Sequence, residues 1–181
     1  MAVRARLDGD LDTLVAVLGA VHREDGYPAY WPDDPTGWLS PRELLGAWVA
    51  GERIVGHVAL GSVRVGRAAA VWSDALGVPP GGLAAVSRLF VAPEARGVGV
   101  GGRLLDAACA AAASRDLYPV LDVVETNRDA IRFYERRGWR RVHSEPWADA
   151  RDEERTVHYY VSAYPNASTA QQCRPRRTRA G

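Results

Sequence analysis

The pattern of apolar positions divides the first third of the chain into a strand and two helices. Val3–Arg6 alternates as a short opening strand does. Apolar residues between Leu11 and Val21 recur at helical spacing, so we expect an amphipathic helix that ends near His22. Residues 23–40 hold three prolines and two glycines among aromatic and acidic residues, which is typical of a loop.

A second helix is predicted from Ser40 to about Ala50. Ser40, Pro41 and Glu43 fit the N-cap, N1 and N3 positions of a capping box, a motif that opens helices.

The rest of the chain alternates between short apolar runs and two longer helical segments. The predicted strands are Arg53–Leu60, Ala68–Ser73, Ala84–Val91, Pro119–Val124, Trp139–Ser144 and Thr156–Ala163. The predicted helices are Gly99–Ser114 and Ala130–Arg137, the second ended by Gly138. Antiparallel strands come first and a β-α-β crossover lies in the second half. This order predicts a mixed α/β or α+β sheet rather than a series of βαβ units.

Length and composition favour one globular domain over residues 1–164. The chain has 181 residues, of which 47% are hydrophobic and 25% charged, enough for a sizeable core. From Pro165 onward hydrophobicity is low and basic residues cluster, which predicts a flexible basic tail over residues 165–181. No run is apolar enough for a membrane span or a signal peptide, so we expect a cytoplasmic protein without a membrane partner.

Charge and cysteine content exclude several function classes. The net charge of +1 argues against a nucleic-acid-binding protein. All 23 basic residues are Arg, so an arginine at any one position carries little information. Cys109 and Cys173 are too few and too far apart for a disulfide framework or a metal site, so we expect no metal.

The most informative stretch is a glycine-rich loop, Gly97–Gly102, between an apolar strand and a helix. Glycines here allow positive φ angles, and their backbone N–H groups can converge on an anion. The following helix adds its N-terminal dipole and unpaired amides. Such a loop can bind a pyrophosphate without any lysine. It lacks the GK[ST] ending of a P-loop, which excludes nucleotide hydrolysis.

The same glycines also fit the G-x-G-x-x-G fingerprint of dinucleotide-binding proteins, with Asp122 about 20 residues further on. The context differs from that fold, however. Pro93–Arg96 separates the strand from the glycines, and at least three strands precede the motif. Too little chain follows to supply the remaining parallel strands of a Rossmann domain.

The stretch LFVAPEARGVGVGGRLL, residues 89–105, resembles the defining motif of the GNAT superfamily of acyl-CoA-dependent N-acetyltransferases, whose core is [RQ]-x-x-G-x-[GA]. Residues 121–139, LDVVETNRDAIRFYERRGW, are similar to the next segment of that family. The close match covers about residues 85–142. The resemblance implies a mostly antiparallel, twisted sheet, splayed between its fourth and fifth strands and flanked by about four helices.

The resemblance also implies a binding site for acetyl-CoA. In the family, the strand equivalent to Leu89, Phe90 and Val91 splays at a bulge, and its free backbone groups pair with the pantetheine arm. Backbone amides of the loop would wrap the pyrophosphate, while the side chain of Arg96 steadies the loop or the phosphates. The loop residues concerned are Gly97, Val98, Gly99, Val100, Gly101 and Gly102. Asn127 would bond the pantetheine.

Two catalytic residues are carried over from the family. Tyr134 matches the position of the general acid, which protonates the departing CoA thiolate near the CoA sulfur. Packing on its helix face is the alternative role for this tyrosine. Asp122 matches a position that holds a glutamate base in some members. Glu125 and three histidines compete with it on sequence alone, and for the histidines structural roles are the alternative. These histidines are His22, His57 and His158. A backbone N–H near Val91 would stabilise the oxyanion.

The acceptor site is expected in the segment after the first helix, which sets specificity in this family. Aromatic rings beside carboxylates could hold a cationic amine with an apolar body. The candidate substrate-binding residues are Tyr27, Tyr30, Trp31 and Asp33, with Asp34 and Trp38 nearby. Alternatively, the rings pack the loop onto the core and the acids cap turns.

These expectations define three functional hypotheses. The first is an N-acetyltransferase that acts on a primary amine of a small molecule, by direct attack in a ternary complex. The second acetylates a protein N-terminus or a side-chain amine. The third is a non-catalytic acyl-CoA-binding regulatory module. Dimers are common in the family, so the resemblance also suggests a homodimer.

Overall fold

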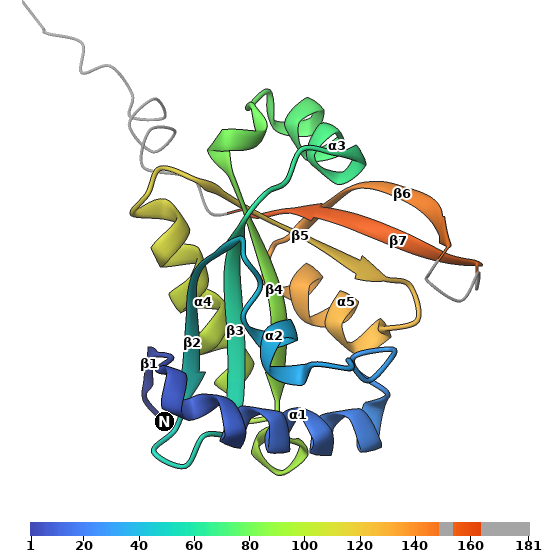
Figure 1. Cartoon of the computed structure of the whole chain (residues 1–181). Helices are drawn as coiled ribbons and strands as arrows, with labels where there is room; N and C mark the ends of the chain where they lie inside the picture. Colours follow the sequence, from blue (N-terminus) through green and yellow to red (C-terminus); the bar gives the residue numbers. More distant parts are fainter. Residues whose placement is uncertain (149–153, 164–181) are drawn as a thin grey trace, which may run out of the picture.

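The computed structural model describes residues 1–148 and 154–163, built around one seven-stranded sheet (Figure 1). The strand order is β1-β2-β3-β4-β5-β7-β6, and every pairing is antiparallel except that of β4 with β5. The strands are β1 Val3–Ala5, β2 Leu44–Ala50, β3 Gly56–Ser62, β4 Leu83–Val91, β5 Tyr118–Val124, β6 Arg140–Ala148 and β7 Glu154–Val161. The helices are α1 Leu11–Asp25, α2 Pro35–Leu39, α3 Arg67–Leu76, α4 Val100–Ala113 and α5 Arg128–Arg136. The predicted mixed sheet is confirmed.

Helices cover both faces of the sheet. The front face, turned toward the viewer in Figure 1, carries α1 and α2 near one end and α3 near the other. On this face, Trp72 of α3 packs against Val120 and Tyr159. The back face carries α4, which packs across β2, β3 and β4, and the side chains of α5. The front face is therefore covered at its two ends and open between them.

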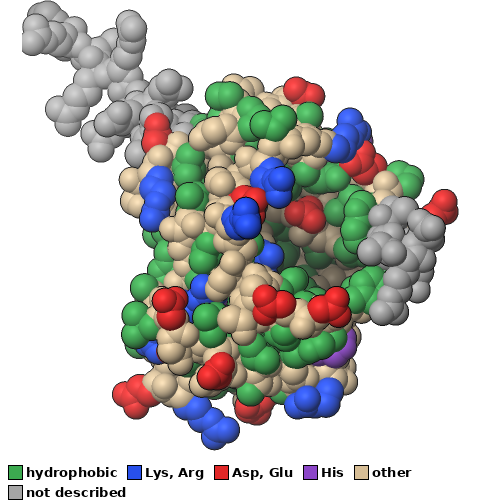
Figure 2. Space-filling view, in the orientation of Figure 1, with side chains coloured by type: hydrophobic (Ala, Val, Ile, Leu, Met, Phe, Trp, Pro, Cys, Tyr) green, Lys and Arg blue, Asp and Glu red, His purple; other side chains and the backbone are tan. Residues whose placement is uncertain are grey.

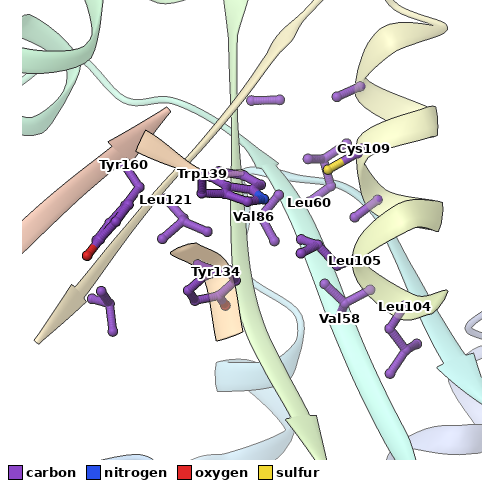
Figure 3. Packing of buried hydrophobic residues seen from close by; sticks show 14 of the residues in the cluster. Val58, Leu60, Val86, Leu104, Leu105, Cys109, Leu121, Tyr134, Trp139 and Tyr160 are labelled. Atoms are coloured by element: carbon purple, nitrogen blue, oxygen red, sulfur yellow. The ribbon is translucent and has the colours of Figure 1, made fainter. Parts of the chain in front are cut away.

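The main core lies between α4 and the back face. Leu104, Leu105, Ala108 and Ala112 are all fully buried, and their spacing forms one apolar stripe along α4. The alanines in this stripe let the helix lie close to the sheet. Figure 3 shows Leu104 and Leu105 at one side of this cluster and Tyr134 at its other edge. The back face of the sheet thereby brings the predicted cofactor helix and the predicted acid into one packed unit.

Strands β4 and β5 separate soon after they begin. They pair only over Leu83–Ala85 and Tyr118–Val120, and beyond these residues the two strands diverge. Figure 1 shows the opening between them, with α5 beside it. This splay between the fourth and fifth strands confirms the prediction. It leaves one edge of β4 without a neighbouring strand.

Residues 44–50 form β2, so the predicted helix over this segment is wrong. Its main chain is bonded in the sheet, because β2 pairs with β1 on one side and β3 on the other. Gly46, Trp48 and Val49 are poor helix formers, whereas Trp and Val favour strands. The capping-box residues form a turn instead, in which the Leu44 N–H donates to the carbonyl of Pro41 at 3.1 Å.

Residues Ala68–Ser73 lie in α3, so the predicted strand there is also wrong. Three consecutive alanines favour a helix, and Ala69 and Trp72 lie three positions apart on its buried face. Gly77 ends the helix at φ +66°, with its N–H bonded to Ser73 O at 2.8 Å. The two errors offset each other, so seven strands are still found. Five helices form instead of four, since α2 lies within the predicted loop.

No helix among the described residues is long and apolar enough to cross a membrane. The predicted tail from residue 165 and Cys173 lie outside the described ranges. Cys109 is buried against the sheet and is a free thiol.

Candidate active site

A bulge in β4 opens the site. Arg88 has a φ of +52°, and the register of β4 against β3 shifts at this point. The carbonyl of Arg88 lies 3.0 Å from Nδ1 of His57, which is fully buried and stacks on the ring of Phe90 at 5.3 Å. Because a carbonyl only accepts, Nδ1 carries the proton. Burial lowers the pKa of His57 to about 4, so the ring is neutral and holds the bulge rather than acting as a base.

Beyond the bulge, β4 turns its free edge to the opening. The N–H of Ala92 donates to Val55 O in the turn before β3, at 2.7 Å. Because successive N–H groups of a strand point to opposite sides, the N–H of Val91 points into the opening. The Phe90 side chain is buried and Leu89 packs against the core, so these residues can offer only backbone groups to a ligand.

The glycine loop forms an open cradle at the start of α4. Gly97 and Gly99 have φ angles of +78° and +81°, which disfavour any residue with a side chain. A Cβ on Gly97 would meet no atom within 4 Å, and one on Gly99 would meet only the end of Arg103. The amides of the first helical turn, from Val100 to Gly102, have no partners within the helix. The cradle therefore fits a pyrophosphate group of CoA.

The remaining loop side chains do not enter this cradle. Arg96 forms an ion pair with Asp25 at the end of α1, and its Nε donates to Val91 O at 3.1 Å. It therefore steadies the loop. Val98 is exposed and Val100 is buried, while Gly102 lies under the guanidinium of Arg137, so only their backbone groups can contact a ligand.

Asn127 and Tyr134 are both fixed on α5. Asn127 caps the helix by accepting the Ala130 N–H at 3.3 Å, which leaves its amide nitrogen as a donor. The ring of Tyr134 packs against Trp139 at 5.8 Å, and among the described residues its hydroxyl has no hydrogen-bond partner. Burial, with smaller contributions from Tyr27 and Asp122, raises the pKa of Tyr134. This phenol stays protonated and can donate.

Asp122 lies on the front face of β5, in a cavity of about 240 Å³. The rest of the lining is apolar or aromatic and comes from Ala68, Val124, Trp147, Val157 and Tyr159. Within the described chain the carboxylate forms no ion pair, and its hydrogen bond is to its own backbone N–H. Asp122 is exposed at the open mouth of this cavity, and the partial loss of water around its carboxylate raises its pKa. Figure 2 shows a hollow on this face with acidic side chains around it.

The structure brings Asp122, Tyr134 and Tyr27 to the same opening. Tyr27 is coupled electrostatically to Asp122, and Tyr134 is coupled to both. Asp122 projects from the front face, whereas Tyr134 comes from α5 and the back-face core. The carboxylate of Asp122 and the phenol of Tyr134 thus approach the gap between β4 and β5 from opposite sides.

The other predicted substrate residues lie further away. Tyr30 contacts Arg155 of β7, with the guanidinium 5.9 Å from its ring. Trp31 packs on His22 at 5.4 Å and is 40% exposed, and Asp33 is exposed. None of these lines the cavity beside Asp122. Nearby, Asp34 caps α2 by accepting the N–H of Gly37 at 2.9 Å. This is the structural role that the sequence allowed as the alternative to substrate binding.

The competing bases are occupied elsewhere. His22 bonds Pro28 O at 2.9 Å, and His158 bonds the Ser144 hydroxyl at 2.9 Å. Glu125 accepts the N–H of Thr156 at 3.1 Å. Asp122 is therefore the acidic residue that lines this cavity, and among the described residues no His, Cys, Asp and Glu cluster could hold a metal.

Three residues at this site were not foreseen from sequence. Trp147 and Tyr159 enter through the pairing of β6 with β7, which has no local signature. Arg88 did have one. Ala84 and Val86 face the back-face core, so strict alternation would bury Arg88 there too. A charged residue at a core position indicates a bulge that turns the side chain to the other face.

Comparison with known proteins agrees with this geometry. The chain shares its fold with a ribosomal-protein-alanine N-acetyltransferase from Brucella melitensis (20% identity, 90% of this chain and 99% of that one, TM-score 0.67). The chain also shares its fold with a putative acetyltransferase from Salmonella typhimurium, solved with its cofactor acetyl-CoA (18% identity, 92% of this chain and 98% of that one, TM-score 0.64). A third protein with this fold is Arabidopsis thaliana NAA60 in complex with acetyl-CoA (18% identity, 88% of this chain and 97% of that one, TM-score 0.67).

No curated protein sequence matches the chain. The sequence profile of the acetyltransferase (GNAT) family, however, matches residues 13–139, which include the β4 bulge, the glycine loop, Asp122 and Tyr134. The chain therefore belongs to the acetyltransferase (GNAT) family, as an acyltransferase that uses acetyl-CoA.

Proposed function

We propose that this enzyme transfers the acetyl group of acetyl-CoA to a primary amine of a small molecule bound beside Asp122, by direct attack in a ternary complex. The observation that carries the proposal is the Asp122 carboxylate, which forms no ion pair within the described residues, in a largely apolar cavity across the strand opening from Tyr134. A carboxylate in such a place favours a cationic amine and can then remove its proton.

The cofactor would be held mainly by backbone groups. The edge of β4 at Leu89–Val91 would pair with the pantetheine amides, and the Gly97–Gly102 amides would surround the pyrophosphate. Asn127 would donate to the pantetheine through its free amide nitrogen. Acetyl-CoA supplies the acetyl group, activated as a thioester.

The protein moves two protons in this scheme. Asp122 takes a proton from the ammonium of the acceptor, directly or through one water, and its raised pKa makes it a stronger base than an ordinary aspartate. Tyr134 keeps its proton on Oη until the CoA thiolate departs. The Val91 N–H stabilises the negative charge that develops on the carbonyl oxygen.

The size of the cavity favours a small acceptor. A volume of about 240 Å³ is just below the usual range for ligand sites, about 300–1,000 Å³, and suits a metabolite-sized body. Among the proteins with the same fold, the Brucella melitensis enzyme is named for a protein substrate. Arabidopsis thaliana NAA60 has also been crystallised with a bisubstrate analogue. A peptide N-terminus is therefore the rival acceptor to test.

The test is an amine panel read by released CoA thiol and by product mass. It contains small aliphatic and aromatic amines, amino acids, amino-sugars and an alanine-starting peptide. We expect at least one free small amine to be acetylated faster than the peptide. Preference for the peptide would overturn the proposed acceptor class. Binding of acetyl-CoA without thiol release on any amine would point to the non-catalytic module.

A matched pair of variants tests the base. Asp122→Asn should lower turnover about 100-fold or more, since general base catalysis contributes 10²–10⁴-fold. Glu125→Gln, at the end of the same strand but outside the cavity, should leave turnover nearly unchanged. Because the pKa of Asp122 is raised on folding, its ionisation destabilises the fold as pH rises. Asp122→Asn should therefore melt no lower than wild type, and equal losses in both variants would remove Asp122 from the mechanism.

A further inference from the structure

Arg88 is a half-buried guanidinium without an acidic partner. Its Nε donates to the carbonyl of Trp38, and its Nη1 donates to the Ser87 hydroxyl at 3.0 Å. The cation lies 4.9 Å from the centre of the Trp38 ring. No carboxylate of the described chain lies within ion-pair distance of it, and burial lowers its pKa. Two of the five guanidinium N–H donors are used, which leaves one on Nη1 and two on Nη2.

These free donors face a second hollow on the front face of the sheet. This cavity of about 200 Å³ is lined by Arg88 and Ser87 of β4, and by the ends of β2 and β3. It also contains Glu43 and Arg64, whose side chains pair with each other at 3.1 Å. Glu43 and Arg6 both act electrostatically on Arg88, with opposite signs. Because Glu43 is paired with Arg64, Arg88 forms no ion pair with the described residues. An anion in this hollow would meet a guanidinium already fixed in position.

The two cavities lie on the same face of the sheet, one against β4 and the other against β5. Ala85 is paired with Val120, so Ser87 and Asp122, two residues further on, stand at the same height on the front faces of β4 and β5. Arg88 is bonded to Ser87, which places its guanidinium at this level. Neighbouring strands are about 4.8 Å apart where they pair and further apart once they diverge. Tyr27 interacts electrostatically with both Arg88 and Asp122, so the cation and the carboxylate border the same opening.

We propose that the acceptor is a free amino acid with an apolar side chain, whose carboxylate binds Arg88 while its amine faces Asp122. This inference rests on the proposed function and specifies its substrate. The side chain would occupy the cavity walled by Trp147, Val157 and Tyr159. A guanidinium binds a carboxylate through two parallel N–H···O bonds, for which Arg88 retains donors. A peptide N-terminus has no carboxylate at this position and would leave the cation unpaired.

Matched substrates test the inference on the wild-type enzyme. L-Leucine, leucinamide and 3-methylbutylamine share an apolar body but differ in the group next to the amine. We expect kcat/KM for leucine to exceed that for the other two by about 10- to 100-fold, since a charge-assisted pair is lost in each. The amide carries the less basic amine and would react faster if charge were not recognised. Slower turnover of leucinamide than of leucine would therefore show that the enzyme recognises the carboxylate.

Two variants locate the effect at Arg88. Arg88→Gln should lower kcat/KM for leucine about 10- to 100-fold and change that for 3-methylbutylamine by less than about threefold. Arg42→Gln removes an exposed arginine beside the same hollow that does not line it, and should leave the ratio of the two substrates unchanged. Calorimetry with acetyl-CoA checks that each variant is folded and binds its cofactor. If Arg88→Gln does not fold, the wild-type substrate series still decides.

The outcomes separate this inference from the proposed function. Equal turnover of leucine, leucinamide and 3-methylbutylamine would overturn the carboxylate site and leave the small-amine function standing. An equal loss of turnover on all three substrates in Arg88→Gln would also overturn the carboxylate site and leave the small-amine function standing. Failure to acetylate any free amine would instead overturn the proposed function itself.

Discussion

The glycine loop and the cavity beside Asp122 are built in different ways. The loop is one contiguous segment, residues 96–102, and it offers backbone amides whose direction is set by two positive φ angles. The cavity is assembled from side chains of α3, β5, β6 and β7, which are far apart in sequence. A site made of backbone tolerates many changes of side chain but few changes of glycine. A site made of side chains can change its ligand through single substitutions.

The glycine loop and the cavity beside Asp122 also differ in how their charged groups are paired. In the loop, the charge of Arg96 is already satisfied by Asp25, so the attraction for phosphate comes from amides and the helix dipole. On the acceptor side, Asp122 and Arg88 each lose part of their water and form no ion pair with any residue of 1–148 or 154–163. Unpaired charges cost stability, and proteins retain them chiefly where a ligand pairs with them. The acceptor side therefore carries the specificity.

The largest effect should come from the backbone of the loop. Gly99→Val places a β-branched residue at φ +81°, so the loop must change conformation and its amides must turn away. We expect acetyl-CoA affinity to fall about 100-fold or more, measured by calorimetry. Gly77→Val is the matched control, because Gly77 has φ +66° and open space around it but ends α3, away from the loop.

Gly77→Val should lower thermal stability by a similar amount without weakening acetyl-CoA binding. If the two variants bind acetyl-CoA equally, the loop is not the pyrophosphate site and the contrast between the two regions fails.

A smaller effect is expected at the point where the two regions meet. Tyr134→Phe removes a hydroxyl that has no protein partner, so stability should barely change. Turnover should fall about 10-fold while the KM for acetyl-CoA stays within about twofold, since an acid acts on the leaving group only. Steady-state kinetics with a fixed amine provides the measurement.

Tyr160→Phe gives the opposite pattern. The buried Tyr160 hydroxyl donates to Glu135 at 2.9 Å, so its loss should cost about 1 kcal/mol of stability and leave turnover intact. An unchanged rate in Tyr134→Phe would assign that ring to core packing alone.

The same difference explains what could be predicted from sequence. The strand before the glycines and the helix after them are encoded locally, so β4, α4 and the glycine loop that joins them are predicted correctly, while the binding role of the loop stays a prediction. Segments decided by distant partners are not predicted correctly. Residues 44–50 became a strand because β1 and β3 flank them, and Ala68–Ser73 became a helix because Trp72 packs onto β7. Tyr27 was predicted and lies near Asp122, while Trp147 and Tyr159 depend on a hairpin without a local signal.

The smallest effect concerns His57, which joins the two regions. Its ring fixes the carbonyl of Arg88 and stacks on Phe90, so it holds both the acceptor cation and the strand edge. Its pKa falls from an ordinary 6.5 to about 4 on folding. The unfolded chain therefore binds a proton that the folded protein does not, and stability present above pH 6.5 is lost as pH falls toward 4. The slope for one proton is at most about 1.4 kcal/mol per pH unit.

Denaturant unfolding between pH 4.5 and pH 7 measures this slope. His57→Gln cannot titrate, yet its amide can still donate to the Arg88 carbonyl, so its stability should vary less with pH than that of wild type. Asp10 and Glu145, whose pKa values are held at about 2 by arginine partners, begin to lose their contributions as pH falls toward their unfolded pKa values of 3.8 and 4.5. Wild type and His57→Gln share these losses, so they cancel in the difference between the two slopes. His158→Gln, at a half-buried position, should flatten the slope less. Equal slopes in wild type and His57→Gln would mean that His57 is not the buried neutral support of the bulge, and that the two regions are joined by other contacts.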